Sequence, residues 1–146
     1  MKRQKGLYMV EFAVVGLVFF ILLFGALEFG RALFVWNTLT EATRRGARLA
    51  AVCPVRHASV YNVTVFNDPG AAGASPVLPG LSSDMVSVNY PTGFVQVRIS
   101  GYQHTLLIPL PLDPLTAPDF VTTLPRESLG CVPNMANGGV CGSQCP

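Results

Sequence analysis

A single carboxylate, Glu11, lies inside the apolar run near the start of the chain, five residues after Gly6. An ionised carboxylate in hydrocarbon costs roughly 2.5–3.5 kcal/mol on insertion scales, so this charge needs a partner or a function. The six residues that open the chain carry three positive charges, and the apolar run continues to Leu27. We therefore interpret this stretch as a processing and assembly signal and not as a plain anchor.

The four cysteines form the second set of reactive side chains: Cys53, Cys131, Cys141 and Cys145. Three of them lie in a Gly-, Pro- and Asn-rich tail, which has little else to hold a shape. A zinc cluster is disfavoured because three residues, not two, separate the last two cysteines, and no histidine follows Cys131. We expect disulfides in an oxidising compartment and no metal, and the sequence leaves all three pairings open.

The sequence contains no motif that indicates catalysis. It has no Gly-x-Ser-x-Gly elbow, phosphate-binding glycine loop, His-Glu-x-x-His or Cys-x-x-Cys. The two histidines, His57 and His104, are expected to be surface or sheet residues and not bases. With a net charge of +2 and no run of Lys or Arg, a nucleic-acid partner is also disfavoured. We predict a building block that is not an enzyme and needs no cofactor.

Proline usage divides the chain at Cys53-Pro54. All twelve prolines lie at or after Pro54, and a proline inside a helix costs about 3 kcal/mol. Residues 7–52 are therefore predicted to form one continuous helix, about 70 Å long at roughly 1.5 Å per residue. The remainder predicts strands and turns, so the fold class is α+β: a long N-terminal transmembrane helix, a small antiparallel β-sheet domain and an irregular cysteine-containing tail.

The first half of this helix is apolar enough to cross a bilayer. No charge occurs in Phe12–Leu27, and with the residues before Glu11 the run reaches the roughly 17–25 residues that a span needs. A cleaved secretory signal is disfavoured because its apolar core is shorter and ends at a small-x-small site. We place the span over about residues 11–33. Basic residues flank both ends, so charge counting does not orient it.

The second half of the predicted helix carries charge pairs and small residues. Glu28 and Arg31, and Glu41 with Arg44 and Arg45, have the spacing of helical ion pairs. Small residues recur four apart and allow close helix packing, although an alanine-rich helix without a partner explains them equally well. These positions are Ala26, Gly30, Ala42, Gly46 and Ala50.

Residues 53–130 are predicted to form a small β-rich domain, and residues 131–146 a cysteine-containing tail. The alternation over Tyr61–Phe66 predicts a strand. Met85–Tyr90 and Phe94–Ser100, joined by a Pro-Thr-Gly turn, predict a hairpin. Phe120–Leu124 is a candidate edge strand. So small a sheet is marginal alone, and packing on the second half of the helix would stabilise it.

The N-terminal region resembles the TadE-like pseudopilins of tight-adherence (Flp, type IVc) pilus systems. The similarity is closest over residues 6–52 and is looser through the hairpin, and it does not extend to residues 131–146. It is carried by the basic leader and three blocks, Gly6 to Phe12, Glu28-Phe29-Gly30-Arg31-Ala32-Leu33 and Glu41-Ala42-Thr43-Arg44-Arg45-Gly46-Ala47-Arg48.

The resemblance implies processing by a prepilin peptidase. Cleavage between Gly6 and Leu7 would remove residues 1–6 as a leader and make Leu7 the new N-terminus. Glu11, beside Phe12, could then neutralise the ammonium group of a neighbouring subunit. The implied partners are other pilin-like subunits, the peptidase transiently and the bacterial inner membrane. The C-terminal domain would be periplasmic, with incorporation into an extracellular pilus as a further expectation.

Two functions follow from these observations. The first is a minor pilin-like subunit needed for assembly of an adhesive type IVc pilus. The alternative is an uncleaved single-pass anchor that presents a periplasmic binding domain. The position of the subunit at a pilus tip, along a shaft or in the assembly platform stays open, as does any adhesive target.

Overall fold

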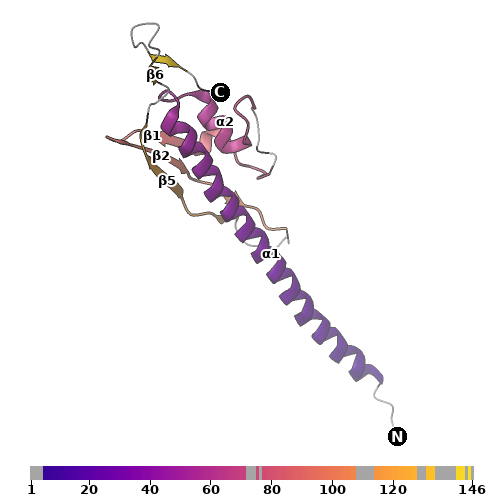
Figure 1. The fold of residues 1–146 in the computed structure, drawn as a ribbon. Helices are drawn as coiled ribbons and strands as arrows, with labels where there is room; N and C mark the ends of the chain where they lie inside the picture. The colour runs from indigo at the N-terminus through magenta and orange to yellow at the C-terminus, as the bar shows by residue number, and fades with distance from the viewer. Residues whose placement is uncertain are drawn as a thin grey trace.

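One long helix carries a small domain on its C-terminal half, while its N-terminal half extends away from that domain (Figure 1). The computed structural model describes residues 5–71, 75, 77–107, 114–127, 131–133, 141–143 and 145. The long helix is α1 (Lys5–Val52), followed by α2 (Ala58–Phe66) and the short 3-10 helix η1 (Ser83–Met85). The strands are β1 (Val86–Asn89), β2 (Phe94–Ile99), β3 (Gln103–His104), β4 (Leu115–Thr116), β5 (Phe120–Pro125), β6 (Cys131–Pro133) and β7 (Cys141–Ser143). The predicted α+β class is confirmed.

Helix α1 ends at Val52, as predicted from the absence of proline before Pro54. Proline disfavours the helical conformation of the residue before it, and Pro54 directly follows Cys53. The last helical turn is closed by the Cys53 N–H, which donates to the Leu49 carbonyl at 2.8 Å. At the other end the helix begins at Lys5, two residues before the predicted start.

The sheet has the order β1-β2-β5, with all neighbours antiparallel. The predicted hairpin is confirmed, and Gly93 (φ +78°) supplies the left-handed residue that its turn needs. In β2 alternate residues are fully buried, while β5 forms an edge, as predicted for residues 120–124. The remaining strands form two short pairs, β3 with β4 and β6 with β7.

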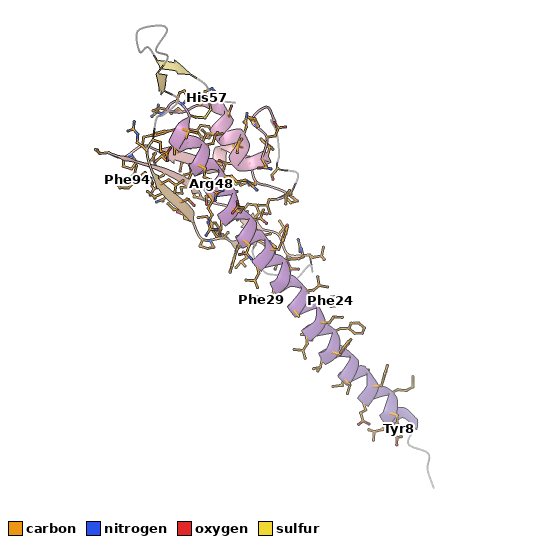
Figure 2. The ribbon with its side chains drawn as sticks, in the orientation of Figure 1. Tyr8, Phe24, Phe29, Arg48, His57 and Phe94 are labelled. Carbon is orange, nitrogen blue, oxygen red and sulfur yellow. A yellow bond between two sulfur atoms is a disulfide. The ribbon has the colours of Figure 1, made fainter. Side chains whose placement is uncertain are left out.

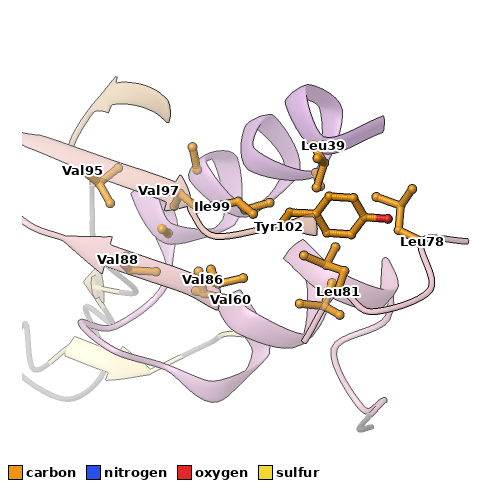
Figure 3. Packing of buried hydrophobic residues seen from close by; sticks show 14 of the residues in the cluster. Leu39, Val60, Leu78, Leu81, Val86, Val88, Val95, Val97, Ile99 and Tyr102 are labelled. Atoms are coloured by element: carbon orange, nitrogen blue, oxygen red, sulfur yellow. The ribbon is translucent and has the colours of Figure 1, made fainter. Parts of the chain in front are cut away.

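The core lies between the sheet and the two helices. Leu39 from α1 and Val60 from α2 meet the valines of β1 and β2 across it, with Tyr102 at one end (Figure 3). The Thr43 hydroxyl of α1 also lies 2.9 Å from the Thr122 hydroxyl of β5. The C-terminal half of α1 thus covers the small sheet, as the sequence predicted.

The strand predicted over Tyr61–Phe66 is wrong, because these residues belong to α2. Burial in this segment repeats at about four residues: Val60 and Thr64 are fully buried, whereas Val63, which an alternating strand would bury, is not. The His57 side chain accepts from the Ser59 N–H at the start of the helix, and Asn67 ends it in the left-handed conformation. Capping and packing on α1 therefore override the β-branched composition.

Close packing of α1 and α2 depends on Gly46. A Cβ built at this position would overlap the Thr64 hydroxyl and lie 3.2 Å from the Thr64 Cβ. Thr64 is fully buried, and its hydroxyl donates to the Val60 carbonyl at 2.7 Å. The absence of a side chain at Gly46 lets the two helices approach.

We predict that Gly46→Ala lowers the melting temperature of the full chain in detergent. Overpacking costs about 1–3 kcal/mol, and we expect this cost to exceed the roughly 1 kcal/mol that alanine gains in a helix interior. Thermal unfolding followed by near-ultraviolet circular dichroism measures the difference. Thr64→Ala in the same chain should recover part of the loss.

Gly30→Ala is the matched control, because a Cβ at Gly30 meets no atom within 4 Å. It should keep or raise the melting temperature through helix propensity alone. Equal melting temperatures for the two alanine variants would contradict the role of Gly46.

Candidate functional site on the membrane helix

The N-terminal half of α1 is not covered by any other described part of the chain, and we call residues 7–27 its bare segment. Every residue from Leu7 to Leu27 except Gly16 is exposed, and the side chains radiate from the helix without cover between Tyr8 and Phe24 (Figure 2). At roughly 1.5 Å per residue these residues span about 32 Å, close to the roughly 30 Å of a bilayer core. By length and composition α1 is able to cross a membrane.

The residues predicted to direct processing and assembly lie at the free end of this bare segment. Gly6 and Leu7 belong to the first turn of α1. The side chains of Leu7, Glu11 and Phe12 are exposed. Within the described part of the chain Glu11 forms no ion pair. The site offers a carboxylate and an apolar surface to another molecule.

The bare segment ends at Glu28, where the domain first contacts α1. One Glu28 carboxylate oxygen lies 3.0 Å from His104 Nε2, and the other accepts from the Leu107 N–H at 3.3 Å. Arg31, one turn along the helix, donates to both oxygens at 3.0 and 3.2 Å. We call these four residues the Glu28 clasp. It joins the helix to the segment that follows β2.

The sequence predicted only part of the Glu28 clasp. The Glu28–Arg31 pair was predicted from spacing and is present. His104 was expected to be a surface or sheet residue, and it lies in the short strand β3, where it is 2% exposed and faces Glu28. A glutamate at the end of an apolar run indicates that its carboxylate needs a partner. The neighbouring residues in the sequence do not indicate that this partner is His104, 76 residues away.

Tyr102 closes the core above the clasp. It is 4% exposed, and its hydroxyl donates to the Pro79 carbonyl at 3.2 Å. Burial raises the pKa of Tyr102, and the positive charge of Arg31 partly opposes that shift. The phenol therefore stays neutral and keeps its donor role at physiological pH.

The small residues predicted for helix packing fall into two groups. Ala42, Gly46 and Ala50 are buried inside this chain, where Gly46 faces α2. Ala26 and Gly30 are exposed, and a Cβ at Gly30 would meet open space. Only the second group remains available to another helix.

Two of the four candidate cysteines are joined. Cys53, fully buried at the end of α1, forms a disulfide with Cys145 across a separation of 92 residues, with 5.3 Å between their Cα atoms. The backbones of Cys131 and Cys141 belong to the β6–β7 pair, in which Cys131 lies opposite Ser143 and Cys141 opposite Pro133. Their side chains lie outside the described part of the chain.

Comparison with known proteins identifies the helix. The family model of the TadE-like protein matches residues 6–48. This segment of the chain is TadE-like. The match covers the bare segment, the clasp residues on α1 and Gly46, and it confirms the resemblance predicted from the motifs. No curated protein and no solved structure matches the chain.

The TadE-like description applies to the matched helix, residues 6–48, and not to the domain that follows it. Among the described residues, no group of three His, Cys, Asp or Glu side chains is placed to hold a metal ion. The groups that the TadE-like helix presents are suited to binding lipid and other helices.

We predict that Glu28→Ala loosens the TadE-like helix from the domain. The change leaves the His104 imidazole buried and the Leu107 N–H without their carboxylate acceptor. The melting temperature should fall, and the Leu107 amide should exchange hydrogen faster. Asp119→Ala is the control, because it removes only an exposed pair with Arg98 at 3.3 Å. Equal effects of the two variants would mean that the clasp contributes no more than a surface ion pair.

We predict that reducing the disulfide destabilises the domain. Closing a loop of this length contributes up to about 4–5 kcal/mol by constraining the unfolded chain. Cys53→Ser and Cys145→Ser should each lower the melting temperature, and the paired substitution should cost no more than either one. Peptide mapping without reductant should recover a Cys53–Cys145 linked peptide. Recovery of both cysteines as free thiols from the oxidised protein would contradict the pairing.

Proposed function

We propose that this protein is a minor pilin-like subunit that a prepilin peptidase processes and that takes part in assembly of a type IVc adhesive pilus. The observation that carries the proposal is the bare apolar segment, which lies within the TadE-like match and which the protein's own domain leaves uncovered. So long an exposed apolar surface requires lipid or the helices of other subunits. The domain would stand in the periplasm, and the Cys53–Cys145 disulfide supports an oxidising compartment.

We place the membrane span over Leu7–Leu27, slightly earlier than the predicted 11–33. The domain is in contact with α1 from Glu28 onward, and Ala32 and Val35 are already buried by protein. A span reaching residue 33 would pull His104 and the clasp into hydrocarbon, at a cost in desolvation. The shorter span is still long enough to cross a bilayer core.

The position of Gly6 suits a cleavage site. A peptidase needs an extended backbone, and the first four N–H groups of a helix have no partner within it. Gly6 is the second residue of α1, and glycine lowers helix stability by about 1 kcal/mol relative to alanine. The Gly6–Leu7 bond therefore lies where the helix opens most easily. Cleavage there would leave a single ammonium group on Leu7.

Glu11 would meet that ammonium group. It lies one helical turn beyond Leu7, on the same face, and helical side chains point back toward the N-terminus. A carboxylate near a helix N-terminus is also stabilised by the helix dipole. Pairing with the ammonium group of a neighbouring subunit would neutralise two charges at the membrane edge and set the register of the two helices.

The test is the N-terminus of the protein isolated from native membranes. Intact mass and N-terminal sequencing should show a chain that begins at Leu7. Glu11→Gln should reduce the pili on the cell surface, because it removes the charge that pairs with the new terminus. Glu41→Gln is the matched control, since Glu41 is exposed on the same helix well beyond the proposed span.

Two outcomes would contradict the proposal. Retention of residues 1–6 in the mature protein would favour the uncleaved anchor with a periplasmic binding domain. Normal cleavage and normal pili in Glu11→Gln would remove the proposed charge pairing while leaving processing intact.

A further inference from the structure

Three apolar residues surround the Glu28 clasp and point to a second membrane contact. Phe29 follows Glu28 on α1 and is 64% exposed, and Leu107, whose N–H binds the Glu28 carboxylate, is 69% exposed. Leu115 is 46% exposed and pairs across the short β3–β4 ladder with His104, the other partner of Glu28. We call Phe29, Leu107 and Leu115 the foot of the domain.

The foot lies at the height where the bare segment of α1 ends. Leu107 is linked to Glu28 by a hydrogen bond from its own N–H. Leu115 is linked to Glu28 through its strand partner His104. Phe24 and Ile21 lie four and seven positions before Glu28, so they share the face of α1 that the domain covers above. Both are exposed, at 47% and 61%. The domain thus ends directly above an uncovered apolar helix face.

We propose that the foot inserts into the lipid interface of the same bilayer that α1 crosses, and that Leu107 is its main anchor. The proposal rests on the membrane-embedded state of α1 that the proposed function requires. Exposed leucine and phenylalanine side chains bury their apolar surface at the boundary between headgroups and acyl chains. Two separate segments, α1 and the segment around Leu107, would then fix the tilt of the domain.

The charges beside the foot fit a lipid partner. Arg31 lies four residues after Leu27, about 6 Å along the helix at roughly 1.5 Å per residue, which is the depth of the headgroup region. Its side chain is 37% exposed, so it reaches the solvent or headgroup phosphates while it holds Glu28. The clasp therefore presents polar groups to the headgroups and apolar groups to the acyl chains.

The experiment uses single tryptophan probes in the full chain. Trp36, the one tryptophan of the sequence, is first replaced by phenylalanine, so that each probe is the single tryptophan of its variant. Trp36→Phe breaks no hydrogen bond, because Trp36 Nε1 has no hydrogen-bond partner among the described residues. Leu107→Trp, Phe20→Trp and Phe94→Trp are then each reconstituted in vesicles of phosphatidylethanolamine and phosphatidylglycerol. The vesicles contain phosphatidylcholine brominated either near the headgroup or near the chain end. Bromine quenches tryptophan only at short range.

The expected result is loss of fluorescence from Leu107→Trp, stronger with bromine near the headgroup than with bromine near the chain end. Phe20→Trp, within the span, should be quenched most by bromine deep in the bilayer. Phe94→Trp is the matched control, because Phe94 is also an exposed apolar residue, 49% exposed, but lies at the hairpin turn. It should keep its fluorescence with both lipids.

The other outcomes overturn the inference in distinguishable ways. If Phe20→Trp is quenched while Leu107→Trp behaves like Phe94→Trp, the foot does not reach lipid and the span stands. A blue-shifted but unquenched Leu107→Trp means that protein, such as a second copy of this chain, covers the residue. If Phe20→Trp is unquenched, the span fails, and the proposed function fails with it.

Discussion

The structure depends on one constraint: a single unbroken helix leaves its first half exposed and buries one face of its second half in the domain. The backbone of α1 satisfies its own hydrogen bonds from Lys5 to Val52, so it can leave lipid and enter protein without a break. Only the side chains change, from the exposed run that ends at Leu27 to buried residues such as Leu39. The contacts between the domain and α1 therefore begin at Glu28, where the exposed apolar run ends.

The domain is inseparable from this helix. So small a sheet depends on having its apolar face covered, and here the C-terminal half of α1 supplies one wall of its core. Gly46 allows α2 to pack closely against α1. The Cys53–Cys145 disulfide links the C-terminal tail to the end of α1. The TadE-like match ends at residue 48, close to the point where these contacts are complete. The matched segment thus includes both the exposed apolar run and one wall of the domain core.

Sequence reasoning succeeded where a local rule has no strong competitor. Proline excludes itself from helix interiors, which fixed the end of α1, and the Pro-Thr-Gly turn between alternating valines defined the β1–β2 hairpin. It failed over Tyr61–Phe66, because alternation of β-branched residues also fits a short helix buried along one face. The caps at His57 and Asn67 and the space beside Gly46 decided for the helix.

The sequence by itself determined the long helix, its apolar first half, the anomalous carboxylate at Glu11 and the family resemblance. These features depend on residue type and near-neighbour spacing, which the backbone enforces locally. Only the tertiary structure decided that Glu28 binds His104, 76 residues away, and that Cys53 pairs with Cys145. It also decided that Ala42, Gly46 and Ala50 pack inside the chain while Gly30 stays free. Partners so distant are chosen by the path of the whole chain, which short-range patterns do not encode.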